Sequence, residues 1–341
     1  MKTIALLFVA CFFVAVSLAQ PADAKQLYES AQAFMRQGDY ANAALVLNRA
    51  LQQEPKNTAM GKDLAQSYYY QGDNGKALAT IKPLLDRDDA DDQCYQIAGM
   101  VYKSMEDPES AEKMYKKGIK KFPDSGPLYN EYGEMLSGLQ NPIAIKEWEK
   151  GIEMDPSYSK NYYNACRFYF DNGNNMWSIL YAETFVNMEP MSSKTPQIKS
   201  MLLESYKRLF AETDLTKNNP PPSGKGKISF TDAYLQTMNK QSAVATNGIN
   251  PETLTMIRTR FILDWYADFG NKFPYKQFEL QRQLLQEGLF DAYNQWIFGP
   301  TQNLAAYQNW TSTHAAEYGE FSRFQKGRVF RIPAGQYYQT K

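Results

Sequence analysis

Four series of residues recur along the first half of the chain with a shared period of about 34 residues. One series consists of small residues, one of alanines, one of large and mostly aromatic residues, and one of prolines with a single Asp. The series are Ala31, Ala65, Gly99, Gly133 and Cys166; Ala43, Ala77, Ala111 and Ala144; Phe34, Tyr68, Tyr102, Leu136 and Tyr169; and Pro55, Asp89, Pro123, Pro156 and Pro190. A period shared by independent series indicates stacked repeats, each of which buries its apolar faces only against its neighbours.

Each repeat is predicted to be a pair of helices. The small residues and the alanines mark where the two helices cross closely, since larger side chains there would cost about 1–3 kcal/mol through overpacking. Gly38, Gly72 and Gly173 stand where a turn with positive φ is expected between the helices, and the prolines stand where each second helix ends.

These offsets resemble those of the tetratricopeptide repeat family. Tyr95 and Tyr129 occupy the early aromatic position of the family pattern, and Tyr40 follows the first turn as the pattern requires. Two features depart from it: Gly61 replaces the early aromatic residue of the second repeat, and the fourth repeat lacks one residue near Asn141. The resemblance covers residues 24–190 as five repeats, and it implies an all-α fold, a right-handed α-solenoid of helix pairs.

The remainder of the chain is predicted to be helical, with less regularity. A helix over 195–210 is expected to cap the last repeat within residues 191–217, and a stretch rich in Pro and Gly predicts a linker over 218–227. Residues 228–341 are then an aromatic-rich helical domain. Helices are expected over 251–269 and 275–296, the latter ended by Gly299-Pro300, with a third from Gln302. Residues 328–333 are either a short strand or an extended arm.

The N-terminus predicts export. Lys2 precedes 13 apolar residues, and small residues stand at Ser17 and Ala19, which together are typical of a signal peptide over residues 1–19. A buried N-terminal helix, or a lipid attached at Cys11, is the weaker alternative. The mature protein is therefore expected to be periplasmic or secreted, with no transmembrane segment.

Composition limits the function classes. Lys+Arg and Asp+Glu both number 37, and this balance argues against a nucleic-acid partner. A single His and three Cys argue against a zinc site, and no metal or cofactor is expected. Cys94 and Cys166 lie two repeats apart, which is farther than a disulfide reaches, so both are expected to be buried thiols.

Candidate catalytic residues are few. His314 is an isolated histidine, and Asp264 and Asp268 lie one helical turn apart beside Trp265. Such a carboxylate pair could serve acid–base chemistry in a cleft, but more often it forms part of a solvated helix face. The acidic run at residues 86–92 lacks the spacing of a calcium loop and is interpreted as a turn between repeats.

The resemblance implies a partner-binding groove on the first helices of the repeats. Its groove-facing offsets fall on Tyr28, Gln32, Met35, Lys62, Gln66, Tyr69, Tyr70, Met100, Lys103, Asn130, Glu134, Tyr163, Arg167 and Phe170. This set is mixed polar and aromatic, as interface anchors often are, and it does not match the clamp by which some family members hold a terminal carboxylate. The alternative is that these aromatic residues pack against the C-terminal domain.

The sequence therefore favours an exported interaction module, an adaptor or assembly scaffold that is not an enzyme and binds a polypeptide partner in the groove. Two alternatives stay open. One is an enzyme acting on envelope glycans, with its site in the C-terminal domain. The other is a structural subunit whose aromatic face forms a permanent oligomer.

Overall fold

The computed structural model describes residues 23–217 and 227–339, and helices are the only regular secondary structure in those ranges. The all-α class is thereby confirmed. The predicted signal peptide, and all of the predicted linker except Lys227, lie outside the described residues. The chain divides into two compact units, residues 1–90 and residues 91–341, called here the N-terminal and C-terminal units.

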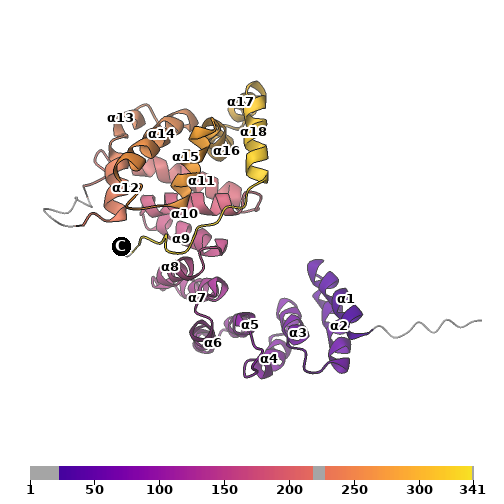
Figure 1. The fold of residues 1–341 in the computed structure, drawn as a ribbon. Coiled ribbons are helices and arrows are strands. Elements are labelled where there is room, and N and C mark those ends of the chain that lie inside the picture. The colour runs from indigo at the N-terminus through magenta and orange to yellow at the C-terminus, as the bar shows by residue number, and fades with distance from the viewer. Residues whose placement is uncertain (1–22, 218–226, 340–341) are drawn as a thin grey trace, which may run out of the picture. The chain divides into compact units, whose positions relative to one another are not determined.

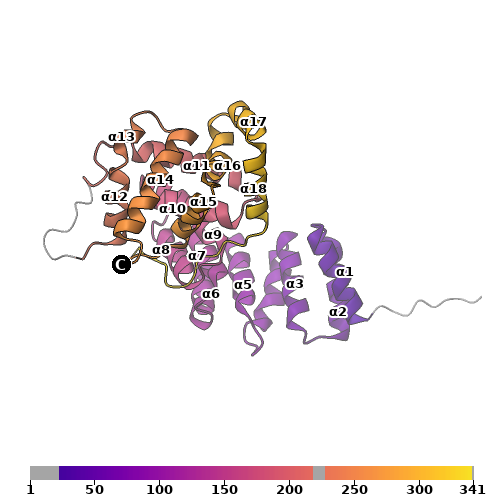
Figure 2. The same ribbon diagram turned by 45° about the horizontal axis from the view of Figure 1, so that its top comes forward.

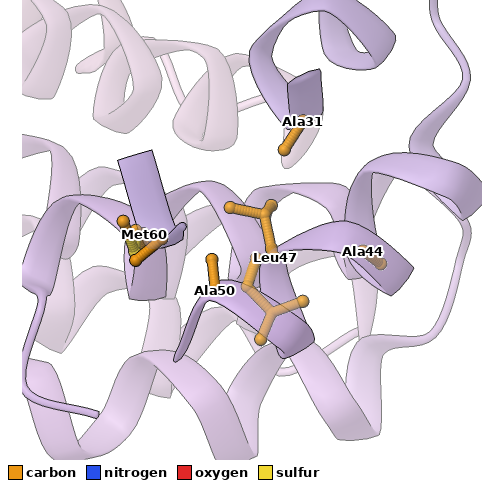
Figure 3. Packing of buried hydrophobic residues seen from close by; sticks show 7 residues of the cluster. Ala31, Ala44, Leu47, Ala50 and Met60 are labelled. Carbon is orange, nitrogen blue, oxygen red and sulfur yellow. The ribbon is translucent and has the colours of Figure 1, made fainter. Parts of the chain in front are cut away.

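The N-terminal unit holds two helix pairs and a short 3-10 turn (Figure 1). Its elements are α1 (Ala24–Arg36), α2 (Tyr40–Gln53), α3 (Thr58–Tyr70), α4 (Asn74–Ile81) and η1 (Lys82–Leu84). Alanines and a few larger residues from three of these helices form its core, as Figure 3 shows for Ala31, Leu47 and Met60. The Asp side chains at positions 39 and 73 cap α2 and α4 by accepting hydrogen bonds from backbone N–H groups.

The C-terminal unit begins with three further helix pairs and continues into eight more helices (Figures 1 and 2). The pairs are α5 (Asp92–Ser104) with α6 (Pro108–Lys121), α7 (Gly126–Gly138) with α8 (Ala144–Met154), and α9 (Ser159–Asp171) with α10 (Asn175–Met188). The helices that follow are α11 (Thr195–Leu209), α12 (Phe230–Asn239), α13 (Ser242–Ala245), α14 (Pro251–Asp268), α15 (Lys276–Gln286), α16 (Phe290–Gln302), α17 (Leu304–Thr313) and α18 (Ala315–Lys326). None of the described helices is long and apolar enough to cross a bilayer.

Close packing between the two helices of a pair explains the small-residue series. The five small residues of the first helices and the four alanines of the second helices are all buried. A Cβ added at Gly99 would lie 2.3 Å from the Tyr115 ring, and one added at Gly133 would lie 2.4 Å from Nε1 of Trp148. The absent side chains therefore make room for a large residue of the second helix in the same pair.

The turn inside each pair requires a left-handed residue. Gly38, Gly72 and Gly173 have φ values of 76°, 78° and 77°, as predicted. The same repeat position is held by Glu106 and Gln140 in the two intervening pairs, with φ values of 58° and 55°. The left-handed conformation thus recurs in all five pairs, although glycine, which adopts it without a Cβ penalty, occupies only three. Each second helix followed by a repeat proline ends two residues before that proline.

The C-terminal helices share their core with the last helix pair. Helix α10 buries every residue from Met176 to Asn187, whereas the second helices of the earlier pairs have exposed faces. An aromatic cluster around Phe230 joins Trp177 of α10 to Trp265 of α14 and Phe278 of α15. These helices therefore cover the end of the repeat stack.

The segment after α18 is an extended arm, one of the two forms predicted. Figures 1 and 2 show it leaving α18 and running back across the C-terminal helices. It buries Phe330, Ile332 and Tyr338, and the Tyr338 ring stacks on Phe230 at 4.6 Å with its hydroxyl donating to the Pro274 carbonyl. Its last described residue, Gln339, donates to the hydroxyls of Tyr169 and Tyr181.

Two details of the predicted C-terminal helices are wrong. The single helix predicted over 275–296 is two helices, because Gly288 adopts a φ of 71° and ends α15. Pro300 does not terminate the next helix, since α16 continues to Gln302. Helix α18 was not expected separately.

A lysine from another helix accounts for the proline inside α16. Pro300 has no N–H, so the carbonyl of Trp296 four residues earlier loses its helical donor. The Lys199 ammonium of α11 donates to that carbonyl at 2.8 Å and lies 3.5 Å from the centre of the Trp296 ring. Burial lowers the pKa of Lys199 to about 7 from 10.5. The folded state therefore binds fewer protons than the unfolded state between these values, so this residue's contribution to stability rises with pH across that window.

We predict that Lys199→Met lowers the free energy of unfolding by about 1–3 kcal/mol, because it leaves the Trp296 carbonyl without a donor. In a Pro300→Ala background the restored N–H should satisfy that carbonyl, and the same substitution should cost clearly less. A double-mutant cycle measured by urea denaturation tests this coupling. Equal costs in both backgrounds would contradict it.

We also predict opposite effects for two glycines of α7. Gly133→Ala should lower the free energy of unfolding by about 1–3 kcal/mol, because its Cβ enters the Trp148 ring. Gly138→Ala is the matched control, since a Cβ there meets nothing within 4 Å and should gain up to about 1 kcal/mol of helix propensity. Urea midpoints of the two variants provide the comparison.

Candidate partner-binding site

The fourteen predicted groove residues all lie on the first helices of the pairs. Seven belong to α1 and α3 of the N-terminal unit, and seven to α5, α7 and α9 of the C-terminal unit. Twelve are half-buried or exposed, and two, Asn130 and Tyr163, are buried.

The N-terminal group centres on a tyrosine–carboxylate pair. Burial is the main reason that the pKa of Tyr28 rises to about 12, and the neighbouring Asp63 carboxylate raises it further by charge and hydrogen bonding. Burial likewise raises the pKa of Asp63, against the opposing effects of Tyr28 and Lys62. Nearby, the exposed Tyr70 stacks on the Tyr40 ring at 4.6 Å. This group is therefore both polar and aromatic in character.

The C-terminal group contains a cavity of about 430 Å³, called here the repeat cavity. Its walls come from α7, α8, α9 and the residue that precedes α11. Three predicted residues line it, Glu134, Tyr163 and Arg167, together with Asn164, Asp171 and Lys194. The size lies within the range of ordinary ligand sites, about 300–1,000 Å³.

Asn130 does not face a partner, contrary to prediction. Its side chain is fully buried, because the next repeat packs over it and Asn164 donates to its Oδ1 at 2.9 Å. Asn130 and Asn164 each donate to Oε1 of Glu134 at 3.2 Å. Two asparagines one repeat apart therefore orient an exposed carboxylate at the cavity wall.

Tyr163 is also buried, with 8% of its surface exposed, so it is not the freely exposed anchor that the offsets predicted. The ring of Phe185 in α10 packs against it at 5.3 Å. The Lys194 ammonium lies 4.2 Å from the centre of the Tyr163 ring, and the Arg167 guanidinium lies at 5.2 Å. The ring thereby holds two exposed cations at the cavity.

Two aromatic residues of the predicted groove, Tyr163 and Phe170, are contacted by α10 and α11. Phe185 covers one side of Tyr163, and the Arg208 guanidinium of α11 lies 4.0 Å from the Phe170 ring centre. The arm contacts Tyr169, Tyr181 and Pro274, none of which lines the repeat cavity. The described part of the arm thus leaves this cavity open. Lys194 precedes α11, beyond the five predicted repeats, and the offsets could not identify it.

The candidate catalytic carboxylates are engaged elsewhere. Asp264 accepts a hydrogen bond from Gln241 at 2.9 Å, and Asp268 forms an exposed ion pair with Lys240 at 2.8 Å. Asp89 in the acidic run accepts from Thr58 and Arg87, which hold the pKa of its carboxyl far below its usual range and secure a turn. The described residues contain no cluster of three or more His, Cys, Asp or Glu that could hold a metal ion.

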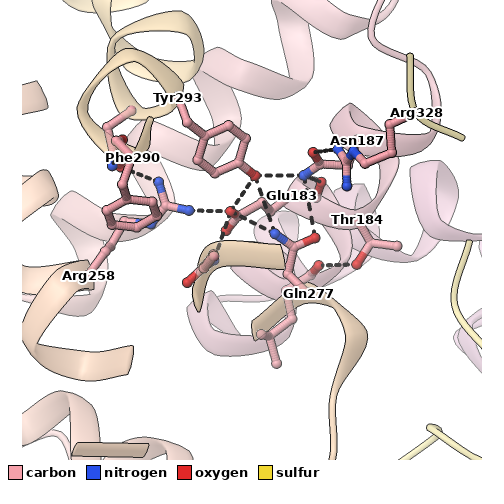
Figure 4. A network of polar contacts seen from close by, with 11 residues as sticks. Glu183, Thr184, Asn187, Arg258, Gln277, Phe290, Tyr293 and Arg328 are labelled. Atoms are coloured by element: carbon pink, nitrogen blue, oxygen red, sulfur yellow. Dashed lines mark hydrogen bonds and ion pairs between the residues drawn. The ribbon is translucent and has the colours of Figure 1, made fainter. Parts of the chain in front are cut away.

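The most deeply buried charges form a network that sequence reasoning missed (Figure 4). The Glu183 carboxylate of α10 pairs with the Arg258 guanidinium of α14. The same oxygen accepts hydrogen bonds from three residues of α15 and α16: Gln277 at 2.9 Å, Gln281 at 2.9 Å and Tyr293 at 2.8 Å. Because the ion pair is 1–3% exposed and the carboxylate has four donors, the network joins helices and is closed to substrate. The sequence contains one signal of this network, which is the charged residue Arg258 directly beside the apolar stripe of its helix.

Together, the paired helices and the left-handed turns define an α-helical repeat protein. Models of the tetratricopeptide repeat family match residues 34–100 and 92–124. No curated protein matches the chain by sequence. Residues 34–124 are therefore tetratricopeptide repeats, a fold that is typical of protein-interaction modules.

Solved structures of repeat proteins are similar at low sequence identity. A tetratricopeptide repeat protein of Thermus thermophilus has 16% identity and a TM-score of 0.45, over 55% of this chain and 98% of that one. One from Parabacteroides merdae has 17% identity and a TM-score of 0.40, over 77% and 97%. YrrB, described as having an unusual peptide-binding site, has 15% identity and a TM-score of 0.36, over 54% and 92%.

The buried network generates a stability prediction. Arg258→Met leaves the Glu183 carboxylate buried without its counterion and should lower the free energy of unfolding by about 3–5 kcal/mol. Lys240→Met is the matched control, since it removes an exposed pair and should cost less than about 1 kcal/mol. Similar urea midpoints for the two variants would contradict the assigned role.

Proposed function

We propose that the protein is an exported, non-catalytic interaction module that holds a polypeptide partner at the repeat cavity. The observation that carries this proposal is the open cavity of about 430 Å³ on the first helices of the last two pairs. Repeat stacks generally bind partners on such extended surfaces.

The lining suits a polypeptide segment. The side-chain amides of Asn164 and Asn172 offer both donors and acceptors, as a backbone does. Arg167 and Lys194 supply positive charge, and Glu134 and Asp171 supply negative charge, so the wall is mixed and close to neutral. Charge pairs with such a wall would fix the register of a bound polypeptide. We expect the affinity for that polypeptide to depend weakly on salt, because the wall is close to neutral.

Export rests on the N-terminal sequence, and the cysteines are compatible with it. Cys94 and Cys166 are both fully buried thiols, as expected, and burial raises the pKa of the Cys166 thiol. Inaccessible thiols of this kind resist oxidation in the periplasm or outside the cell. A non-catalytic role is supported by the engagement of Asp264 and Asp268 with neighbouring side chains.

Partner capture by the mature chain, residues 20–341, tests the proposal. Arg167→Glu should reduce capture from a native envelope extract about tenfold or more, because it reverses one of the charges at the cavity. Lys160→Glu is the matched control: the residue is exposed on the same helix, lies outside the cavity lining, and undergoes the same charge change.

The comparison of the two variants decides the outcome. Equal capture by the Arg167→Glu variant and the native protein would refute the site. Equal loss in both variants would show a nonspecific charge effect and would also count against it. Size measurement across a dilution series separates a monomeric adaptor from a permanent oligomer.

A further inference from the structure

We propose a second binding site, for an uncharged saccharide, in a cavity of about 350 Å³ where α17 and the end of α16 meet the start of α14. The inference is independent of the polypeptide site, because none of its lining residues belongs to the repeat cavity. It is also separate from Asp264 and Asp268, which do not line it.

Helix α17 packs on α16 and α18 through half-exposed side chains. None of its ten residues is buried, yet it directs Tyr307 and Trp310 into the cavity wall. Gly299 of α16 lets the tyrosine approach closely, since a Cβ there would lie 2.7 Å from the Tyr307 ring. Both rings also contact Tyr318 of α18, and the hydroxyls of Tyr307 and Tyr318 share a hydrogen bond. The two rings remain half-exposed, so the ring surface that these contacts do not use is available to a ligand.

The polar lining favours a neutral ligand. Amide side chains dominate it, including those of Gln295, Gln302 and Asn309, and it contains no Lys or Arg. Its carboxylate, Glu252, accepts a hydrogen bond from Gln295 at 3.2 Å. Without a cation the cavity does not suit a phosphate or carboxylate ligand, whereas amides both donate and accept and so match hydroxyl groups.

The aromatic part of the wall is fixed before any ligand arrives. The Trp310 indole and the His314 imidazole stack at 4.4 Å with an interplanar angle of 5°. Nδ1 of His314 also lies 3.1 Å from the Trp310 carbonyl and 3.0 Å from the Thr313 hydroxyl. A flat aromatic surface bordered by amides matches a sugar ring, whose faces carry C–H groups and whose edges carry hydroxyls.

Affinity electrophoresis of the mature chain tests the proposal. Native gels would contain dextran, laminarin or galactomannan as neutral probes, with polygalacturonate as the anionic comparison. We expect at least one neutral polysaccharide to retard the protein. Trp310→Ala should weaken that binding about tenfold or more, as loss of a central aromatic anchor does, and Asn309→Ala should weaken it less.

Controls keep the result interpretable. Gln308→Ala changes an exposed residue of the same helix outside the cavity lining and should retain native retardation. Trp310 is half-buried and contacts Tyr318 and His314, so Trp310→Ala should keep the native helical signal and lose at most a small part of the thermal midpoint, which circular dichroism checks. Arg167→Glu should bind saccharide normally, which separates this site from the polypeptide site.

Several outcomes would overturn the proposal. They are no retardation by any of the three neutral polysaccharides, retardation by the anionic probe alone, and unchanged retardation of Trp310→Ala. Loss of polypeptide capture in that variant without any saccharide binding would instead assign the cavity to the protein partner.

Discussion

The buried carboxylate of Glu183 is the point on which the arrangement of the C-terminal unit depends. A carboxylate removed from water costs several kcal/mol unless it is fully paired. Here one side chain of α10 is satisfied by donors from α14, α15 and α16. Those three helices must therefore pack together around α10 in one register, or a charge is left buried without partners. Hydrophobic burial alone would tolerate several packings, and the polar network selects one.

The same helix also explains why the repeat stack ends where it does. A terminal repeat normally needs a polar outer face. Helix α10 is instead buried on nearly all sides, and the aromatic cluster around Phe230 covers part of it. The arm completes this cover by stacking Tyr338 on Phe230. The C-terminal helices thus act as a cap, and their additional surface becomes available for other binding.

The repeat half was predictable because sterics act on residue type at fixed offsets. Gly133 had to be small for Trp148 to fit, and that requirement is visible as a period. A left-handed turn without glycine is not predictable in the same way. Glu106 and Gln140 adopt this turn because the helices on either side impose it. Pro300 gives the opposite error, because it predicts a helix end where the helix continues. A proline terminates a helix only if nothing else satisfies the freed carbonyl, and Lys199 does so from about 100 residues away in sequence.

The binding residues are likewise only partly predictable from the sequence. Offsets within a repeat place a side chain on the first helix, but the exposure of that side chain depends on which neighbouring residues pack against it. Asn130 is buried by Asn164 of the next repeat, whereas Tyr163 is buried by Phe185 on the second helix of its own pair. Lys194 contributes to the cavity from outside the repeats, where no period could indicate it.

The two proposed sites follow from a shared electrostatic property. The repeat cavity balances its charges, and the cavity beside α17 contains no lysine or arginine. Neither therefore carries a net positive charge that would attract anionic ligands over long distances, and screening by salt affects the binding of a neutral ligand weakly. Discrimination must come from short-range pairing and shape, which require side chains already held in place. That condition is met in each case by contacts made without any ligand: asparagines one repeat apart orient Glu134, and the stacked His314 orients Trp310. Preorganisation of this kind lowers the entropic cost of binding, so a modest contact area is sufficient for specific recognition.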